Sequence, residues 1–167
     1  MNNGFTQHDV TVPDVGELGL TLQLPTPWET RSGDDTVALI ARRPEEGAGP
    51  FADNVVVTIE RLPTEGPTEL EQVQGSVLIQ AHSTIADFHL LDDRPSPFAG
   101  QDGWFRAYLQ TAPNQVSAVT QQCFTVRGDA MVSIAVTTLP FRDDEAARLF
   151  EEIAASCRIT TAGKDER

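Results

Sequence analysis

The chain has 167 residues, of which 40% are hydrophobic and 22% are charged, a balance that fits one folded domain and excludes extensive disorder. Its 25 Asp and Glu residues outnumber 12 Lys and Arg residues, so the formal net charge is −13 at pH 7. Because nucleic acids and anionic membrane surfaces are held by basic side chains, neither is an expected partner. Protein partners, neutral ligands and basic segments stay open.

The N-terminal segment, residues 1–16, is polar and irregular, and we expect it to be flexible. Its first ten residues contain no basic region, no apolar region and no small-residue cleavage site, so no secretory signal is predicted. No run of about 18 apolar residues is present to span a membrane. These features favour a cytoplasmic protein without a membrane partner.

Three strands are predicted before the first helix. Residues 18–24 alternate leucine with smaller or polar residues, which is the period of a strand with one buried face. Pro25 and Pro27 end this strand, because proline lacks the amide hydrogen that a sheet needs. Residues 37–41 and 54–62 form the next two strands, and the second of them is rich in β-branched residues.

The first helix is predicted over residues 69–82. Thr68 followed by Glu71 is the spacing of a capping box, in which each side chain accepts or reaches a free backbone amide of the first turn. Apolar residues three or four positions apart then form one stripe along the segment.

The second half of the chain predicts an antiparallel meander and a final helix. The Gly128-Asp129 pair joins two strongly β-prone runs and is a hairpin signal. Asp143 and Asp144 are the expected cap of the helix that follows. The predicted strands are 85–92, 103–111, 117–127 and 130–139, with a short terminal strand over 158–161.

Strands in runs with two intervening helices indicate an α+β fold with a mainly antiparallel sheet of about six to seven strands and two principal helices. A single domain is expected over residues 17–161, with a charged C-terminal tail over 162–167.

No arrangement of reactive residues points to catalysis. His8, His82 and His89 are far from any nucleophile motif, and no metal-ligand spacing is present. We therefore predict no catalytic residue, no metal site and no cofactor. Cys123 and Cys157 are expected to be buried, reduced thiols, and a disulfide or a reactive thiol is the alternative.

An aromatic and basic face is the best candidate for binding. Trp104, Arg106 and Tyr108 alternate along one predicted strand. This pattern fits either a central strand covered on both faces or a face that meets a partner, because Trp, Tyr and Arg are the common anchors of interfaces. Phe98, in a Pro- and Gly-containing loop, is a second candidate contact.

Several motifs resemble the PsbP-like superfamily, and within it the actinobacterial LpqN-type and DcrB-like branch. The opening strand leads into Pro25, Pro27 and Trp28, and the sequence continues with an Asn-Val-Val-Val strand, a Gly103-Trp104 strand and a Gln121-Gln122 strand. The resemblance implies an αβα sandwich, a fold-anchoring role for Pro25, Pro27 and Trp28, and a non-enzymatic role in binding proteins.

The function predicted from sequence is a protein-binding accessory module, either an adaptor or a secretion-type chaperone. The alternative is a small-molecule carrier with an apolar pocket between sheet and helix. A carrier needs an enclosed apolar cavity of roughly 300 Å³ or more, whereas a protein binder needs an exposed surface with apolar character.

Overall fold

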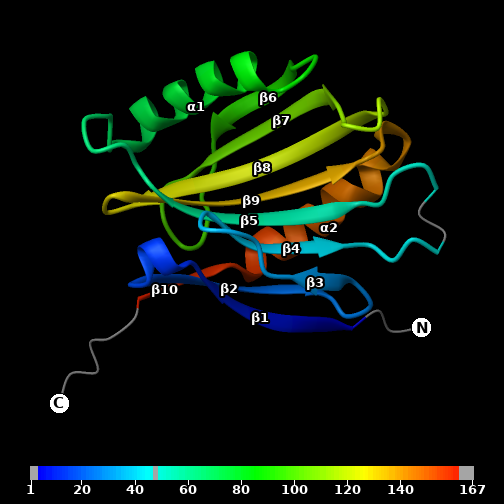
Figure 1. Cartoon of the computed structure of the whole chain (residues 1–167), viewed down its shortest axis with the longest axis horizontal. Helices are drawn as coiled ribbons and strands as arrows, with labels where there is room; N and C mark the ends of the chain where they lie inside the picture. The colour runs from blue at the N-terminus through cyan, green and yellow to red at the C-terminus, as the bar shows by residue number, and fades with distance from the viewer. Residues whose placement is uncertain (1–3, 47–48, 162–167) are drawn as a thin grey trace.

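The computed structural model describes residues 4–46 and 49–161, and it contains two antiparallel sheets and two helices (Figure 1). The three-stranded sheet has the order β1-β2-β10. Its strands are β1 (Phe5–Thr11), β2 (Leu18–Pro25) and β10 (Arg158–Thr161). The predicted α+β class is confirmed, although the strands are divided between two sheets.

The larger sheet has seven strands in the order β3-β4-β5-β9-β8-β7-β6. Its strands are β3 (Glu29–Arg31), β4 (Val37–Arg42), β5 (Asn54–Arg61), β6 (His89–Pro95), β7 (Trp104–Thr111), β8 (Ser117–Arg127) and β9 (Ala130–Thr138). All neighbours pair antiparallel. The expected meander of β6 to β9 is therefore present, and β5 pairs with β9 beside it.

The two helices lie on opposite faces of the seven-stranded sheet (Figure 1). Helix α1 (Leu70–Thr84) lies over one face, and helix α2 (Asp143–Ser156) lies on the other face together with the three-stranded sheet. This arrangement keeps the αβα layers and adds a small sheet beside α2. No helix in the described part of the chain is long and apolar enough to cross a membrane.

The principal core lies between the two sheets and α2. Alternate residues of β2 and β5 point into it, including Leu20, Leu22, Val55 and Val57, which have no exposed surface. Phe150 and other apolar residues of α2 complete it. The alternation seen in the sequence is thus the alternation of a strand with one buried face.

The prediction that the N-terminal segment, residues 1–16, is flexible is wrong for residues 5–15. Strand β1 pairs with β2 in an unbroken register from Phe5 opposite Pro25 to Thr11 opposite Gly19. The 3₁₀ turn η1 (Pro13–Val15) follows, and Val10, Val12 and Val15 are buried. Only Val10 of the seven β1 residues is buried, so the strand carries no apolar alternation. Residues 1–3 and the predicted tail, 162–167, lie outside the described residues.

Both predicted helix caps are wrong in detail. Helix α1 begins after Glu69, and no side chain there bonds to a free amide. Helix α2 follows the 3₁₀ turn η2 (Pro140–Arg142), so Asp143 and Asp144 lie within its first turn. Carboxylates there still favour the helix, because they lie close to the positive end of its dipole.

Candidate functional site

A solvent-open cleft of about 760 Å³ lies between the end of β2 and the first half of α2. We call it the Trp28 cleft. Its apolar lining consists of Phe5, Pro25, Pro27, Trp28, Pro44, Ala146 and Leu149. Its charged lining consists of Arg43, Asp53, Asp144, Glu145, Arg148 and Glu152.

The apolar wall forms where β2 ends. The Trp28 backbone amide donates a hydrogen bond to the Pro25 carbonyl at 3.0 Å, which reverses the chain directly after the strand. The Trp28 side chain is half-buried and packs against the principal core. Phe5, opposite Pro25 on β1, is 39% exposed. The motif that suggested a fold anchor therefore also lines the cleft.

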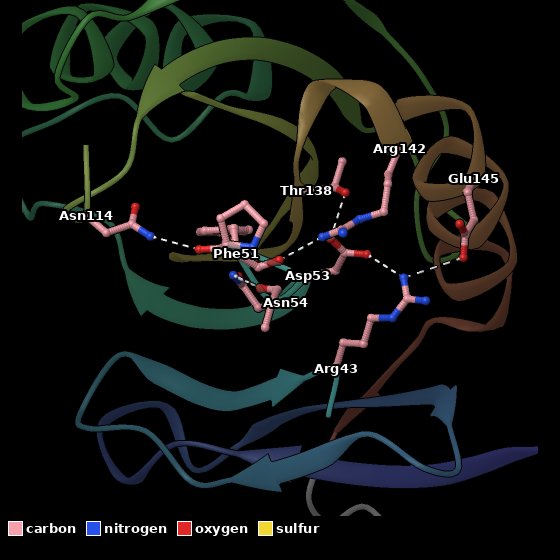
Figure 2. Close-up of polar contacts among 10 residues, drawn as sticks. Arg43, Phe51, Asp53, Asn54, Asn114, Thr138, Arg142 and Glu145 are labelled. Atoms are coloured by element: carbon pink, nitrogen blue, oxygen red, sulfur yellow. Dashed lines mark hydrogen bonds and ion pairs between the residues drawn. The ribbon is translucent and has the colours of Figure 1, made fainter. Parts of the chain in front are cut away.

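One lining residue of the cleft, Asp53, is a buried carboxylate bound by two arginines, as Figure 2 shows. Asp53 is 5% exposed. Its Oδ1 accepts hydrogen bonds from Arg142 Nη2 and Thr138 Oγ1, both at 2.7 Å, and from Arg142 Nε at 3.2 Å. Its Oδ2 accepts a bond from Arg43 Nη1 at 3.1 Å. We call Asp53, Arg142, Arg43 and Thr138 the Asp53 cluster.

The Asp53 cluster joins segments that are far apart in the chain. Arg142 Nη2 also donates to the Phe51 carbonyl at 2.7 Å, and Arg43 Nη1 lies 3.6 Å from a Glu145 carboxylate oxygen at the start of α2. The Asp53 cluster therefore holds the end of β9 and the start of α2 against the segment before β5. With four donors on its two oxygens, the Asp53 carboxylate makes the hydrogen bonds that hold these segments together.

The candidate partner-binding face of β7 is not exposed, because α1 covers it and Asp93 of the neighbouring strand β6 bonds to its side chains. Arg106 has no exposed surface, and its Nε donates to Asp93 Oδ1 at 2.9 Å. Its Nη2 donates to both the backbone and the side-chain oxygens of Gln74 on α1, each at 3.1 Å. Trp104 Nε1 donates to the same Asp93 oxygen at 2.7 Å. Tyr108 is 8% exposed.

This face is therefore a polar layer under α1, which corresponds to the alternative of a strand covered on both sides. Of the described residues, Arg106 Nη1 is a buried side-chain atom with no hydrogen-bond partner. The guanidinium lies 5.6 Å from the centre of the Phe124 ring, a distance at which the cation is attracted to the aromatic face.

Phe98 is not a surface contact either. Its side chain is 2% exposed and belongs to the principal core. Phe98 and Gln101 exchange backbone hydrogen bonds of 2.9 and 3.1 Å, which closes a tight turn and directs the ring inward. The proline and glycine pattern predicted the turn correctly, but it carried no information about which way the ring points.

The thiols are buried and unpaired. Cys123 and Cys157 are free cysteines. Burial raises the pKa of the Cys123 thiol far above its ordinary range and raises that of Cys157 to about 12. The thiolate is the reactive form, so both cysteines are inert at neutral pH. Among the described residues, no group of three or more His, Cys, Asp or Glu side chains is arranged to hold a metal ion.

Sequence reasoning missed the Asp53 cluster, since its members come from four separate segments. One signal was available: Asp53 lies directly before a β-branched strand with one fully buried face, where an ionisable residue needs a partner. The sequence could show that need, but it could not show which arginines meet it.

Taken together, the layers define an α+β domain in which one helix and a three-stranded sheet lie on one face of a seven-stranded antiparallel sheet, and a second helix covers the other face. Comparison with protein-family models gives no match, and comparison with curated proteins gives none either. Solved structures do match over nearly the whole chain, and they show that this is the PsbP-like fold.

Three of these structures illustrate the likeness. The cyanobacterial PsbP protein CyanoP of Synechocystis has a TM-score of 0.66 and 15% identity, with 95% of this chain and 94% of that chain covered. LpqN of Mycobacterium tuberculosis, involved in cell envelope biogenesis, has a TM-score of 0.65 and 14% identity, covering 95% and 93%. The Ran-binding protein Mog1p of Saccharomyces cerevisiae has a TM-score of 0.57 and 16% identity, covering 93% and 96%.

Proposed function

We propose that the protein is a non-enzymatic, protein-binding accessory module and that the Trp28 cleft receives a segment of its partner. The observation that carries this proposal is the mixed lining of the cleft, with an aromatic and proline wall facing a row of charged side chains on α2. Interfaces commonly combine an apolar anchor with a polar rim in this way. The Ran-binding activity of Mog1p is a precedent for protein binding on this fold.

The charges of the cleft favour a basic partner segment. Asp144 and Glu152 are exposed, and neither has an ion-pair partner among the described residues. The net charge of −13 attracts basic segments from a distance and raises the rate at which they meet the protein. We infer a partner segment with an apolar side chain for the Trp28 wall and a Lys or Arg for the α2 carboxylates.

The carrier alternative has less support. The volume of the Trp28 cleft lies within the range of small-molecule sites. However, six of its thirteen lining residues are charged, and it opens to solvent. Three of the six, Asp144, Arg148 and Glu152, have no ion-pair partner among the described residues, so a carrier that buried them against an apolar ligand would lose several kcal/mol, order of magnitude, for each one. The choice between adaptor and chaperone, and the cytoplasmic location, stay predictions.

Site-directed photo-crosslinking tests the proposal. A benzoylphenylalanine at position 152, inside the cleft, should yield a discrete protein adduct in cells of the native host. The same group in place of Ile79, which is 73% exposed on α1, should not. Equal adducts at both positions, or none at position 152, would contradict the proposal.

A matched pair of charge reversals then tests the chemistry of the partner. Asp144→Lys changes the first turn of α2 inside the cleft, and Glu71→Lys makes the same change of charge in the first turn of α1. We expect Asp144→Lys to reduce the position-152 adduct roughly tenfold, about 1.4 kcal/mol, and Glu71→Lys to leave it unchanged. Equal losses would mean that only the overall charge matters.

A further inference from the structure

Strand β1 has one neighbour, β2, and is the outermost strand of the three-stranded sheet (Figure 1). From the described residues, the only backbone hydrogen bond to this segment from outside its strand ladder is that of Thr26 to Gly4, on the β2 side. Its outer edge is therefore a row of unpaired amides and carbonyls.

The register identifies which residues face that edge. The Thr26 amide donates to the Gly4 carbonyl at 2.9 Å, so Gly4 and Thr26 form a hydrogen-bonded pair. In an antiparallel ladder such pairs alternate with pairs whose backbone groups point away from each other. Phe5, Gln7, Asp9 and Thr11 thus direct their amides and carbonyls outward. The Gln23 amide, opposite Gln7, accordingly points away from β1 and donates to Ser156 Oγ at 2.9 Å.

The other sheet edges in residues 4–46 and 49–161 are protected in ways that β1 is not. Strand β6 has an irregular register between Leu90 and Asp92 and ends in Pro95. Strands β3 and β10 have three and four residues. Strand β1 has seven residues in an unbroken register, with no proline and no lysine, which are common protections of natural edges.

We propose that the outer edge of β1 accepts an extended, basic segment of a partner polypeptide by strand addition. Main-chain hydrogen bonds to Phe5, Gln7, Asp9 and Thr11 would supply affinity, which is the known physics of β-augmentation. Asp9 is the only charged side chain of β1. It lies on the exposed side of the three-stranded sheet, where Gln7 and Thr21 donate hydrogen bonds to it. A lysine or arginine of the added strand meets a negative charge there.

A second copy of the chain is the less favourable occupant. Pairing two β1 edges would bring together two molecules that each carry −13, and like charges oppose such an association. The inference rests on the proposed protein-binding role but not on the α2 side of the Trp28 cleft; Phe5 is the one residue that belongs to both the cleft lining and the β1 edge.

The probe is an acetylated, fluorescein-labelled octapeptide of alternating valine and lysine, measured by fluorescence anisotropy. Gln7→Pro removes one outward amide and no hydrogen bond of the β1–β2 ladder, and Gln7→Ala retains the amide. We expect Gln7→Pro to weaken binding roughly tenfold or more, about 1.4 kcal/mol, and Gln7→Ala to bind as the wild type does. The valine–glutamate peptide should also bind at least roughly tenfold more weakly than the valine–lysine peptide.

A second measurement keeps the test independent of how Gln7→Pro folds. Octapeptides with N-methyl groups on the first, third, fifth and seventh residues, or on the second, fourth, sixth and eighth, are titrated into the wild-type protein. When the added strand runs antiparallel to β1 with its lysines on the Asp9 side, only one set of its amides faces β1, so strand addition requires that the two sets differ in binding. Equal binding of both sets, or wild-type binding by a folded Gln7→Pro variant, would overturn the proposal.

Sedimentation velocity tests whether a second copy of the chain occupies the β1 edge instead. A concentration-dependent dimer that Gln7→Pro abolishes would assign the edge to a second copy and overturn the proposal. Asp144→Lys, which tests the cleft, should leave octapeptide binding unchanged within roughly twofold, because Asp144 lies on α2 and is not part of the β1 edge. Failure at the edge can thus be distinguished from failure of the proposed function.

Discussion

Removal of the Asp53 carboxylate should destabilise the protein more than any change to an exposed ion pair. Asp53→Ala leaves the Arg142 guanidinium, whose side chain is 12% exposed, beside a cavity without its countercharge. Breaking a buried pair by removing one partner costs about 3–5 kcal/mol. For a chain of this length, that loss lowers the melting temperature by about 6–20 °C.

The conservative change Asp53→Asn should cost less. The amide oxygen can still accept from Thr138, but the charge-assisted bonds from Arg142 and Arg43 are lost, and a hydrogen bond to a charged group contributes about 1.5–3 kcal/mol. Urea unfolding followed by circular dichroism measures both variants. The matched control is Glu45→Ala, since the Arg42–Glu45 pair has a similar distance of 3.0 Å but side chains that are 52% and 81% exposed. We expect a loss below about 1 kcal/mol there.

A double-mutant cycle provides the stringent test. Arg142→Met removes the cation whose countercharge Asp53→Ala deletes, so the double variant Asp53→Ala/Arg142→Met should be more stable than the sum of the two single losses predicts, by about 1–3 kcal/mol. Losses below about 1 kcal/mol for Asp53→Ala, together with strict additivity, would refute the argument that this charge is buried and compensated.

Three further predictions concern other buried groups. Cys123 and Cys157 should react with a thiol reagent at pH 8 roughly a hundredfold more slowly in the folded protein than in denaturant, because burial raises both pKa values; equal rates would contradict their burial. Burial also raises the pKa of Glu60, so its contribution to stability falls as pH rises above its ordinary value of 4.5. Glu60→Gln should therefore raise the urea midpoint at pH 7 but not at pH 4, and the reverse would exclude this cause. At Gly103, an added Cβ would lie 2.7 Å from the Ser96 carbonyl oxygen, whereas at Gly75 it would meet nothing within 4 Å. Gly103→Ala should lose about 1–3 kcal/mol and Gly75→Ala should gain about 0.5–1 kcal/mol in thermal unfolding; equal shifts would show that packing at position 103 does not matter.

The sequence by itself determined those elements whose signal lies within contiguous residues. The alternating leucines of β2, the hairpin signal at Gly128-Asp129 and the apolar stripe of α1 each lie within a short stretch of sequence, and each corresponds to an element of the structure. Local periods depend on one strand or helix having a single buried face, so no knowledge of the partner element is needed.

Strand β1 and the Asp53 cluster were decided only by the tertiary structure. Strand β1 is held mainly by backbone pairing with β2, and backbone hydrogen bonds leave no trace in side-chain identity. Arg142 and Asp53 are 89 residues apart, so no local pattern relates them. The same holds for Arg106: its alternation with Trp104 and Tyr108 fits either a covered or an exposed face, and only α1, more than 20 residues away in sequence, decides that the face is covered. Burial of a face depends on what packs against it, and that is a property of the whole fold.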